Sequence, residues 1–199
     1  MSLETNTGKA TFVNIKEGKL YTKEKEKEPI FFDAISGTIT GVGFKKDEYQ
    51  GKPYEKMELT IMDGEEKYIL SMRVDSGYFR GFCNSLKTGK PTERIRIAPS
   101  SKNVNDRPQT TCFVSQNNQP LKHAFTLAHP GELPQMEKVQ FKGQEFWDGS
   151  KQIEFWKNWL SSIKWEHPLF ASEKYTPPIE TKTYEPITSD NEPADDLPF

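Results

Sequence analysis

The sequence predicts an all-β domain, a small five-stranded barrel with one helix inserted between its third and fourth strands. Three observations predict it: apolar and polar residues alternate in several segments, glycine-containing turns separate these segments, and one helical pattern interrupts them. A period of two is typical of strands that are buried on one face only. The length of 199 residues favours a single domain with appendages. We expect that domain over residues 1–171 and a tail over residues 172–199.

The first predicted element is a short pair of strands over residues 9–22, which turns at Glu17 and Gly18. Lysine and glutamate then alternate over residues 23–28. This run is electrically neutral, so we interpret it as a solvated loop. The pattern after Ile30 favours strands again, and three glycines there permit the bends and bulges that a small barrel needs: Gly37, Gly41 and Gly43.

Two central strands alternate most clearly, over residues 54–62 and 67–74. The pair Asp63 and Gly64 between them predicts a hairpin turn. Every second residue is placed on an inward apolar face: Met57, Leu59, Ile61, Tyr68, Leu70, Met72 and Val74. The polar residues 45–53 before them are predicted to form a loop.

A helix is predicted next, with Ser76 capping its first turn and Gly89 closing its end as a left-handed residue. Its apolar face is formed by residues with helical spacing: Phe79, Phe82, Cys83 and Leu86. This is the one helix that we expect between strands of the barrel.

Further strands are predicted over residues 93–98, 110–115 and 121–127, with a long polar loop over residues 99–109. Three strands, a helix and two or more further strands follow one another in the order of an OB-fold, a five-stranded Greek-key barrel. The sequence therefore predicts that fold, while residues 129–147 receive no assignment.

A short C-terminal helix is predicted from residue 150 to about residue 163, with one apolar stripe: Ile153, Trp156, Trp159, Leu160 and Ile163. We interpret the tryptophans as packing residues on the barrel or at a subunit interface rather than as a platform for stacking bases. The tail holds five of the chain's 14 prolines and shows no apolar period. We expect it to be disordered, because it cannot bury enough apolar surface to offset its ordering entropy.

Charge is distributed unevenly. The tail holds two lysines and seven acidic residues, a net charge of −5, which leaves 25 basic and 22 acidic residues in the body, a net charge of +3. A mildly basic body with an acidic tail suggests a surface that binds a polyanion and a separate interaction segment. The two cysteines form no CxxC pair, and neither a signal peptide nor an apolar run of about 18 residues occurs. We therefore expect a soluble, cytoplasmic protein with no membrane contact.

The chain ends in Asp190-Asn191-Glu192-Pro193-Ala194-Asp195-Asp196-Leu197-Pro198-Phe199. This segment resembles the tip of bacterial single-stranded DNA-binding proteins, an acidic stretch that ends in Asp-Asp-Ile/Leu-Pro-Phe. In that family an OB-fold binds the strand, and the tip docks on replication, recombination and repair proteins. The body differs by extra segments at residues 1–29 and 129–171, so the chain is more similar to divergent phage proteins with one OB-fold and an acidic, aromatic-ended tail.

The resemblance implies sequence-independent binding of single-stranded DNA in a bacterial or phage-infected bacterial cell, with a homo-oligomer among the assemblies that it allows. It also implies that replication, recombination and repair partners bind the residues of the tip: Asp195, Asp196, Leu197, Pro198 and Phe199.

Binding of a single strand without sequence preference needs basic side chains for phosphates and aromatic faces for bases. The outward positions of the central strands and the polar loops supply both. The candidate residues for single-stranded DNA are Lys45, Lys46, Tyr49, Lys52, Tyr54, Lys56, Lys67, Arg73, Arg94, Arg96, Lys102 and Arg107. No nucleotide-binding, nucleophile-elbow or metalloprotease motif occurs, and the three histidines lack metal-type companions. We therefore expect no catalytic residue, metal or cofactor.

Two alternatives stay open from the sequence. A recombination mediator or annealing protein could share the same body, and a carbohydrate-binding module could use aromatic side chains of a β-barrel to stack sugars. Salt titrations against oligo-dT and against glycans separate DNA binding from sugar binding, and a strand-annealing assay tests the annealing function.

Overall fold

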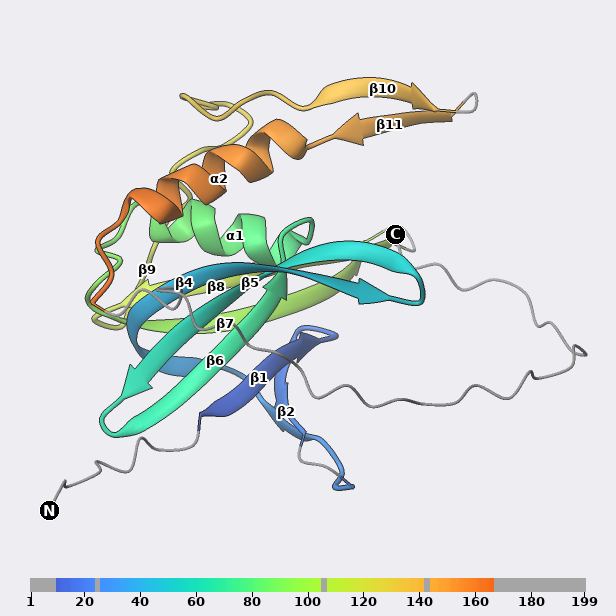
Figure 1. The fold of residues 1–199 in the computed structure, drawn as a ribbon. Helices are drawn as coiled ribbons and strands as arrows, with labels where there is room; N and C mark the ends of the chain where they lie inside the picture. The colour runs from blue at the N-terminus through green and yellow to red at the C-terminus, as the bar shows by residue number, and fades with distance from the viewer. Residues whose placement is uncertain (1–9, 24–25, 105–106, 142–143, 167–199) are drawn as a thin grey trace, which may run out of the picture.

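The structure is a computed structural model that describes residues 10–23, 26–104, 107–141 and 144–166. Most of it is β-sheet, with two helices, which confirms the predicted all-β class (Figure 1). In chain order the elements are β1 (Thr11–Lys16), β2 (Lys19–Thr22), β3 (Ile30–Phe32), β4 (Ile35–Tyr49), β5 (Lys52–Asp63), β6 (Glu66–Arg73), α1 (Gly77–Leu86), β7 (Arg94–Val104), β8 (Arg107–Gln116), β9 (Gln119–Pro120), β10 (Glu137–Phe141), β11 (Gln144–Asp148) and α2 (Ser150–Ser162).

Nine of the described strands form one sheet, in the order β3-β2-β1-β6-β5-β4-β7-β8-β9. The sheet is open, so the expectation of a closed five-stranded barrel is not met. The reason lies in β1, which pairs in parallel with β6 through Thr11–Val13 and Tyr68–Leu70. The edge of β6 that would close the sheet against β8 is therefore occupied by the N-terminal hairpin.

The N-terminal hairpin itself is as predicted. β1 and β2 pair antiparallel, and the turn residues Glu17 and Gly18 both have positive φ, at 51° and 78°. A two-residue turn with that backbone matches the right-handed twist of the strands. Tyr78 of α1 accepts a hydrogen bond from the Gly18 amide at 2.9 Å, so the helix fixes the position of the hairpin.

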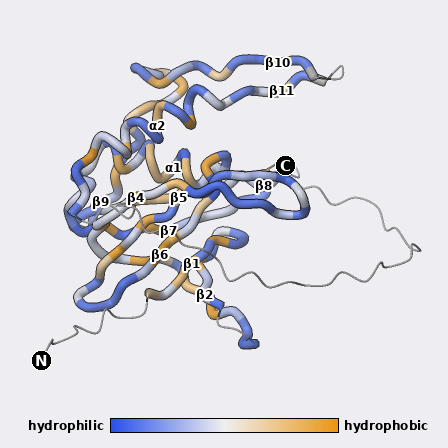
Figure 2. The backbone as a smooth tube through the Cα atoms, viewed as in Figure 1, coloured by the Kyte–Doolittle hydropathy of each residue, from blue (hydrophilic) through white to orange (hydrophobic). Residues whose placement is uncertain are grey.

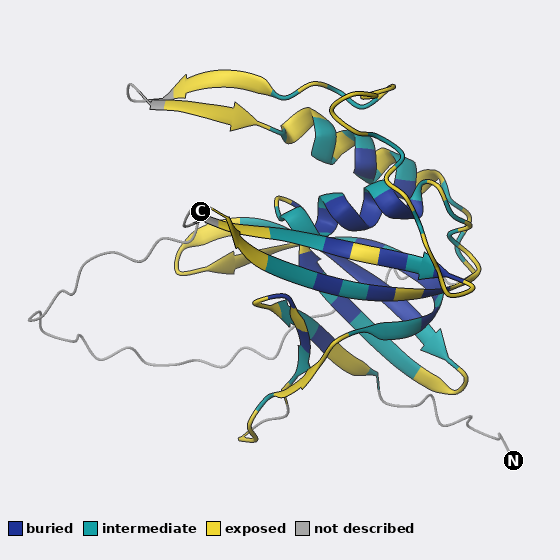
Figure 3. Ribbon diagram, turned by 180° about the vertical axis from the view of Figure 1, so that it is seen from behind, coloured by how far each residue is buried: buried dark blue, intermediate teal, exposed yellow. Residues whose placement is uncertain are grey.

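The predicted loops over residues 45–53 and 99–109 are wrong, because β4, β5, β7 and β8 continue through both segments apart from short turns. Residues 45–56 form an arm of β4 and β5, with Gln50 and Gly51 at its turn at φ 50° and 74°. Residues 99–111 form a second arm of β7 and β8. Polar residues are compatible with strands here because both faces meet solvent. The arms project to the same side of the sheet (Figures 1 and 3), and the β4–β5 arm is hydrophilic at its end (Figure 2).

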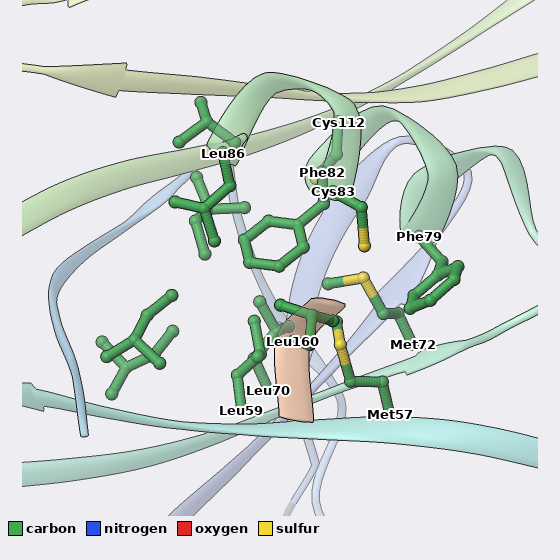
Figure 4. Close-up of a cluster of buried hydrophobic side chains, with 14 of the residues drawn as sticks. Met57, Leu59, Leu70, Met72, Phe79, Phe82, Cys83, Leu86, Cys112 and Leu160 are labelled. Carbon is green, nitrogen blue, oxygen red and sulfur yellow. The ribbon is translucent and has the colours of Figure 1, made fainter. Parts of the chain in front are cut away.

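The core lies between the concave side of the sheet and α1 (Figure 4). All predicted inward residues of β5 are almost fully buried, and so are Leu70, Met72 and Val74 of β6 and its continuation. Tyr68 is only half-buried. The period-two pattern therefore predicted the correct register for the central strands, because a shift by one residue would turn the apolar set to solvent.

Helix α1 begins as predicted, since the Ser76 hydroxyl accepts a hydrogen bond from the Phe79 amide at 3.3 Å. It ends at Leu86 without a left-handed glycine, because Gly89 is not among the glycines with positive φ. That part of the prediction is wrong. Gly89 instead allows a close approach: a Cβ atom there would lie 2.7 Å from Gln116 Oε1.

Gly81 allows α1 to pack directly on the backbone of β8. A Cβ atom at this position would lie 2.6 Å from Thr111 Oγ1 and 2.8 Å from the Cys112 amide nitrogen. We expect Gly81→Ala to lower the free energy of unfolding by about 1–3 kcal/mol, since overpacking outweighs alanine's helix propensity. Urea unfolding checks this, with the exposed Lys151→Ala in α2 as a control. Unchanged or higher stability of Gly81→Ala would contradict the close packing.

The predicted strand over residues 121–127 is wrong, because the described sheet has only β9 (Gln119–Pro120) in this region. The segment is held by α1 instead: Phe125 donates its amide to the Asn84 side chain and accepts from the same amide group, both at 2.8 Å. The side chain of one asparagine thus replaces the sheet as the partner of this backbone.

Helix α2 follows the predicted stripe, and Trp156 and Leu160 are its buried residues. Trp156 contacts Phe125 and Phe155 at ring-centroid distances of 5.7 and 5.1 Å, so its assignment as a packing residue is confirmed. Before α2, residues that the sequence left unassigned form the two-stranded hairpin β10–β11, which extends beyond the helix (Figure 1).

The predicted disordered tail over residues 172–199 lies outside the described residues, as does His167. Of the described helices, the longer has 13 residues, and neither is long and apolar enough to cross a membrane.

Candidate nucleic-acid interface

The candidate interface is one face of the sheet, which we call the outer face. On β5 it consists of the positions that alternate with the buried Met57, Leu59 and Ile61. Strand register places Lys45 of β4 opposite Lys56 of β5, and Lys56 opposite Arg73 of β6. Residues directly opposite in antiparallel strands point to the same side. Three predicted cations therefore form one row across three strands.

The cations of this row are all paired with carboxylates. Glu58, whose side chain is only 6% exposed, lies 2.7 Å from Lys45 Nζ and 3.6 Å from Lys56 Nζ. Asp47 accepts from Lys56 at 3.0 Å, and Arg73 makes a two-point contact with Asp75. Three cations face three carboxylates, so the row is close to neutral before a ligand binds.

The pKa directions agree with these contacts. The hydrogen bond from Lys56 holds the pKa of Asp47 below its usual value. Burial lowers the pKa of Lys56, but the hydrogen bond to Asp47 and the charge of Glu58 raise it more. Burial and the bond to Asp47 raise the pKa of Tyr54, so its ring stays a neutral phenol at physiological pH.

Aromatic rings surround a pocket of about 260 Å³ beside this row, at the base of the β4–β5 arm. Tyr49 and Tyr54 come from the arm, and Tyr21 comes from β2. The Arg73 guanidinium lies 5.4 Å from the centre of the Tyr54 ring, a cation–π distance. We call this the tyrosine pocket. The structure thus brings together four predicted residues: Tyr49, Tyr54, Lys56 and Arg73.

A second group of predicted cations lies at the other end of the outer face. Lys67 is opposite Met62, Arg94 contacts Asp63 at 2.7 Å, and Arg96 is exposed on β7. Six residues separate Lys67 from Arg73 along β6, roughly 20 Å of strand. Between the two groups Glu58 and Thr60 are buried, although the sequence pattern predicted both as outward and exposed. The predicted residues therefore form two groups rather than one continuous track.

The remaining predicted cations belong to the arms. Lys52 is opposite Tyr49 near the end of the β4–β5 arm, and Lys102 is exposed on the β7–β8 arm. Lys46 lies on the other face of its arm, opposite Glu55, which α2 holds through Lys157 at 2.7 Å. Lys46 is thus separated from the row by the strand itself.

The structure leaves two parts of the predicted set without a test. Arg107 begins β8 opposite Val104, and its side chain lies outside the described atoms. The five predicted partner-binding residues 195–199 lie outside the described residues as well.

Two residues near these pockets were missing from the predicted set. Tyr21 reaches the tyrosine pocket from the N-terminal hairpin, which only the parallel pairing of β1 with β6 brings there. Arg80 of α1 lines a second depression together with Arg73. Both contacts join segments that are distant in sequence, and a local period does not reveal them.

The cysteines offer no reactive group at the interface. Cys83 and Cys112 are free and fully buried, and burial raises the pKa of Cys112 to about 12 and that of Cys83 well above its usual value. Within the described ranges, no three His, Cys, Asp or Glu side chains come together as a metal site would require.

Comparison with known proteins gives no relative: no family model matches the chain, and neither the curated proteins nor the solved structures contain a match.

Proposed function

We propose that this protein binds single-stranded DNA without sequence preference, and that its sheet is a variant of the OB-fold. The order of a three-stranded meander, helix α1 and the β7–β8 hairpin supports this assignment of the fold. In this variant the N-terminal hairpin occupies the edge of β6, and the sheet stays open. OB-folds bind oligonucleotides with the face of their second and third strands and with the adjoining hairpin loops.

The observation that carries the proposal is the row of Lys45, Lys56 and Arg73 beside the tyrosine pocket. Basic side chains spaced across neighbouring strands can follow a phosphate backbone. Tyrosine rings beside them can stack on any base, because every base has a π-face. This combination needs no base-specific hydrogen bond, which fits binding without sequence preference.

The carboxylates of the row do not prevent phosphate binding. Asp47 and Asp75 are exposed, and exposed ion pairs contribute only about 0–1 kcal/mol. A phosphate can therefore replace them at small cost. Glu58 is different, since it is buried and contacts two lysines. It orients Lys45 and Lys56 in the absence of DNA and reduces the side-chain entropy that binding has to offset.

We further propose that the acidic terminus of the chain, residues 190–199, recruits replication, recombination or repair proteins. The support for this step is the sequence resemblance of the tip, because the segment lies outside the described residues.

A salt titration with oligo-dT and with a duplex of the same length tests the binding function. We expect strong binding to the single strand, weak competition by the duplex, and a log–log salt slope of roughly −0.7 for each phosphate contact. A glycan titration is the control for sugar stacking. Equal affinity for duplex and single strand, or an affinity that salt does not change, would rule out the proposed interface.

A further inference from the structure

Three depressions of the surface share lining residues and thus lie in sequence along one path. The tyrosine pocket shares Arg73 with a cleft of about 650 Å³ between α1 and the β8 arm strand. That cleft shares His123 with a third depression of about 720 Å³. Trp147 of β11 and Phe125 line this last depression.

The middle cleft has the chemistry of a polyanion site. Arg73, Arg80 and His123 line it, together with amide and hydroxyl groups of α1 and β8. Arg80 makes no ion pair with any part of the chain that the structure describes, unlike Arg73, which Asp75 holds. An arginine without a partner beside polar groups is suited to a phosphate, because its planar fork of donors matches phosphate oxygens.

The third depression has the chemistry of a base site. It is mostly apolar, and the Trp147 side chain on its wall is 63% exposed. The other tryptophans described are buried or half-buried. Lys138 lies 5.4 Å from the centre of the Trp147 ring, so a cation accompanies the exposed ring. An aromatic face next to a lysine repeats the pairing of Tyr54 with Arg73.

The hairpin that carries Trp147 has no other partner in the described structure. β10 and β11 pair only with each other, and all their described side chains are exposed. A two-stranded hairpin is marginally stable alone. Trp147 and Phe146 are neighbours in β11, so they point to opposite faces of the hairpin.

We propose that single-stranded DNA runs from the tyrosine pocket through the Arg80 cleft to Trp147, so that the binding site extends around α1 beyond the sheet. This path rests on the proposed function. It assigns Arg80 to a phosphate and Trp147 to a base, and it gives the β10–β11 hairpin a role in occluding a longer strand. The charge complementarity of the cleft and the exposed aromatic rings at both ends favour DNA as the occupant.

Equilibrium titrations of the full chain with oligo-dT from about 4 to about 16 nucleotides test the path. We expect Trp147→Ala to bind the shortest oligonucleotides like the wild type and to lose roughly 5- to 150-fold affinity for the longest. Arg80→Gln should lose about fivefold at 0.1 M salt and reduce the salt slope by about 0.7.

Two exposed residues provide matched controls. Phe146→Ala removes an aromatic ring from the opposite face of the same hairpin, and Lys164→Gln removes a cation beyond the end of α2. Both should bind all lengths like the wild type. If either Trp147→Ala or Arg80→Gln also does so, the continuous path is wrong while the proposed function stands. If the wild type binds no oligo-dT, the proposed function itself fails.

Discussion

Replacement of Lys56, Lys67 and Arg73 by glutamine together should reduce the affinity for oligo-dT by about 100-fold at 0.1 M salt. Each phosphate contact with a single strand contributes roughly 0.7 to the salt slope, which corresponds to about a factor of five at this salt concentration. Three contacts should therefore also reduce the slope by about 2. The fold should survive, because Lys45 remains beside the buried Glu58, and the other two cations are only partly buried or exposed.

Single variants separate the two groups of cations. Arg73→Gln and Lys56→Gln act beside the tyrosine pocket, where Tyr54→Ala should add a loss of stacking of about 1–3 kcal/mol. Lys67→Gln acts roughly 20 Å away and reports whether the strand reaches that end of the sheet.

Asp47→Asn provides a control of opposite sign. It removes the charge that pairs with Lys56, so binding should be unchanged or tighter. Wild-type affinity of the folded triple variant would move the binding site away from the outer face.

Removal of residues 190–199 should abolish binding to replication, recombination and repair partners from the same cell while the affinity for single-stranded DNA stays equal or rises slightly. Phe199 combines an aromatic ring with the terminal carboxylate, so one partner pocket can read both groups. The acidic residues before it should mainly speed the encounter, an effect that salt weakens. The tethered negative charge also competes weakly with DNA for a basic surface, which explains the expected rise.

Two small changes distinguish recognition of the tip from its charge. Phe199→Ala keeps all acidic residues, and one residue added after Phe199 moves the terminal carboxylate away from the ring. Both variants should lose the partners in pull-down experiments, as the deletion does. Retention of the same partners by both variants would mean that the tail acts only through its charge.

The sequence predicted the central part of the fold because local rules decide it. The period of two in β5 and β6 and the turn at Gly64 are signals within a few residues, and burial of one face leaves a single register. The serine cap and the apolar face of α1 are equally local. These features define the outer face, and with it the row of Lys56 and Arg73.

The rest depended on contacts between distant segments. Polar strands exposed on both faces have no apolar period, so the ends of the β4–β5 and β7–β8 hairpins looked like loops. Only pairing with the facing strand makes them strands. The same holds for residues 121–127, whose backbone is bound by Asn84 some 41 positions earlier in the chain. Ion pairs such as Lys45 with Glu58 also require a known register, so the sequence overstated how positive the outer face is.

The parallel pairing of β1 with β6 has a kinetic consequence. Thr11 contacts Tyr68, so the N-terminal hairpin leaves the ribosome long before its partner strand does. It can form its own turn early, but it cannot join the sheet until β6 has been synthesised and paired. The closure of a long loop is an entropic cost that must be met before such a contact forms. Until then the open edge of β6 offers unpaired backbone groups to any other extended chain, and the speed of this last step determines how long a newly made molecule is vulnerable to aggregation.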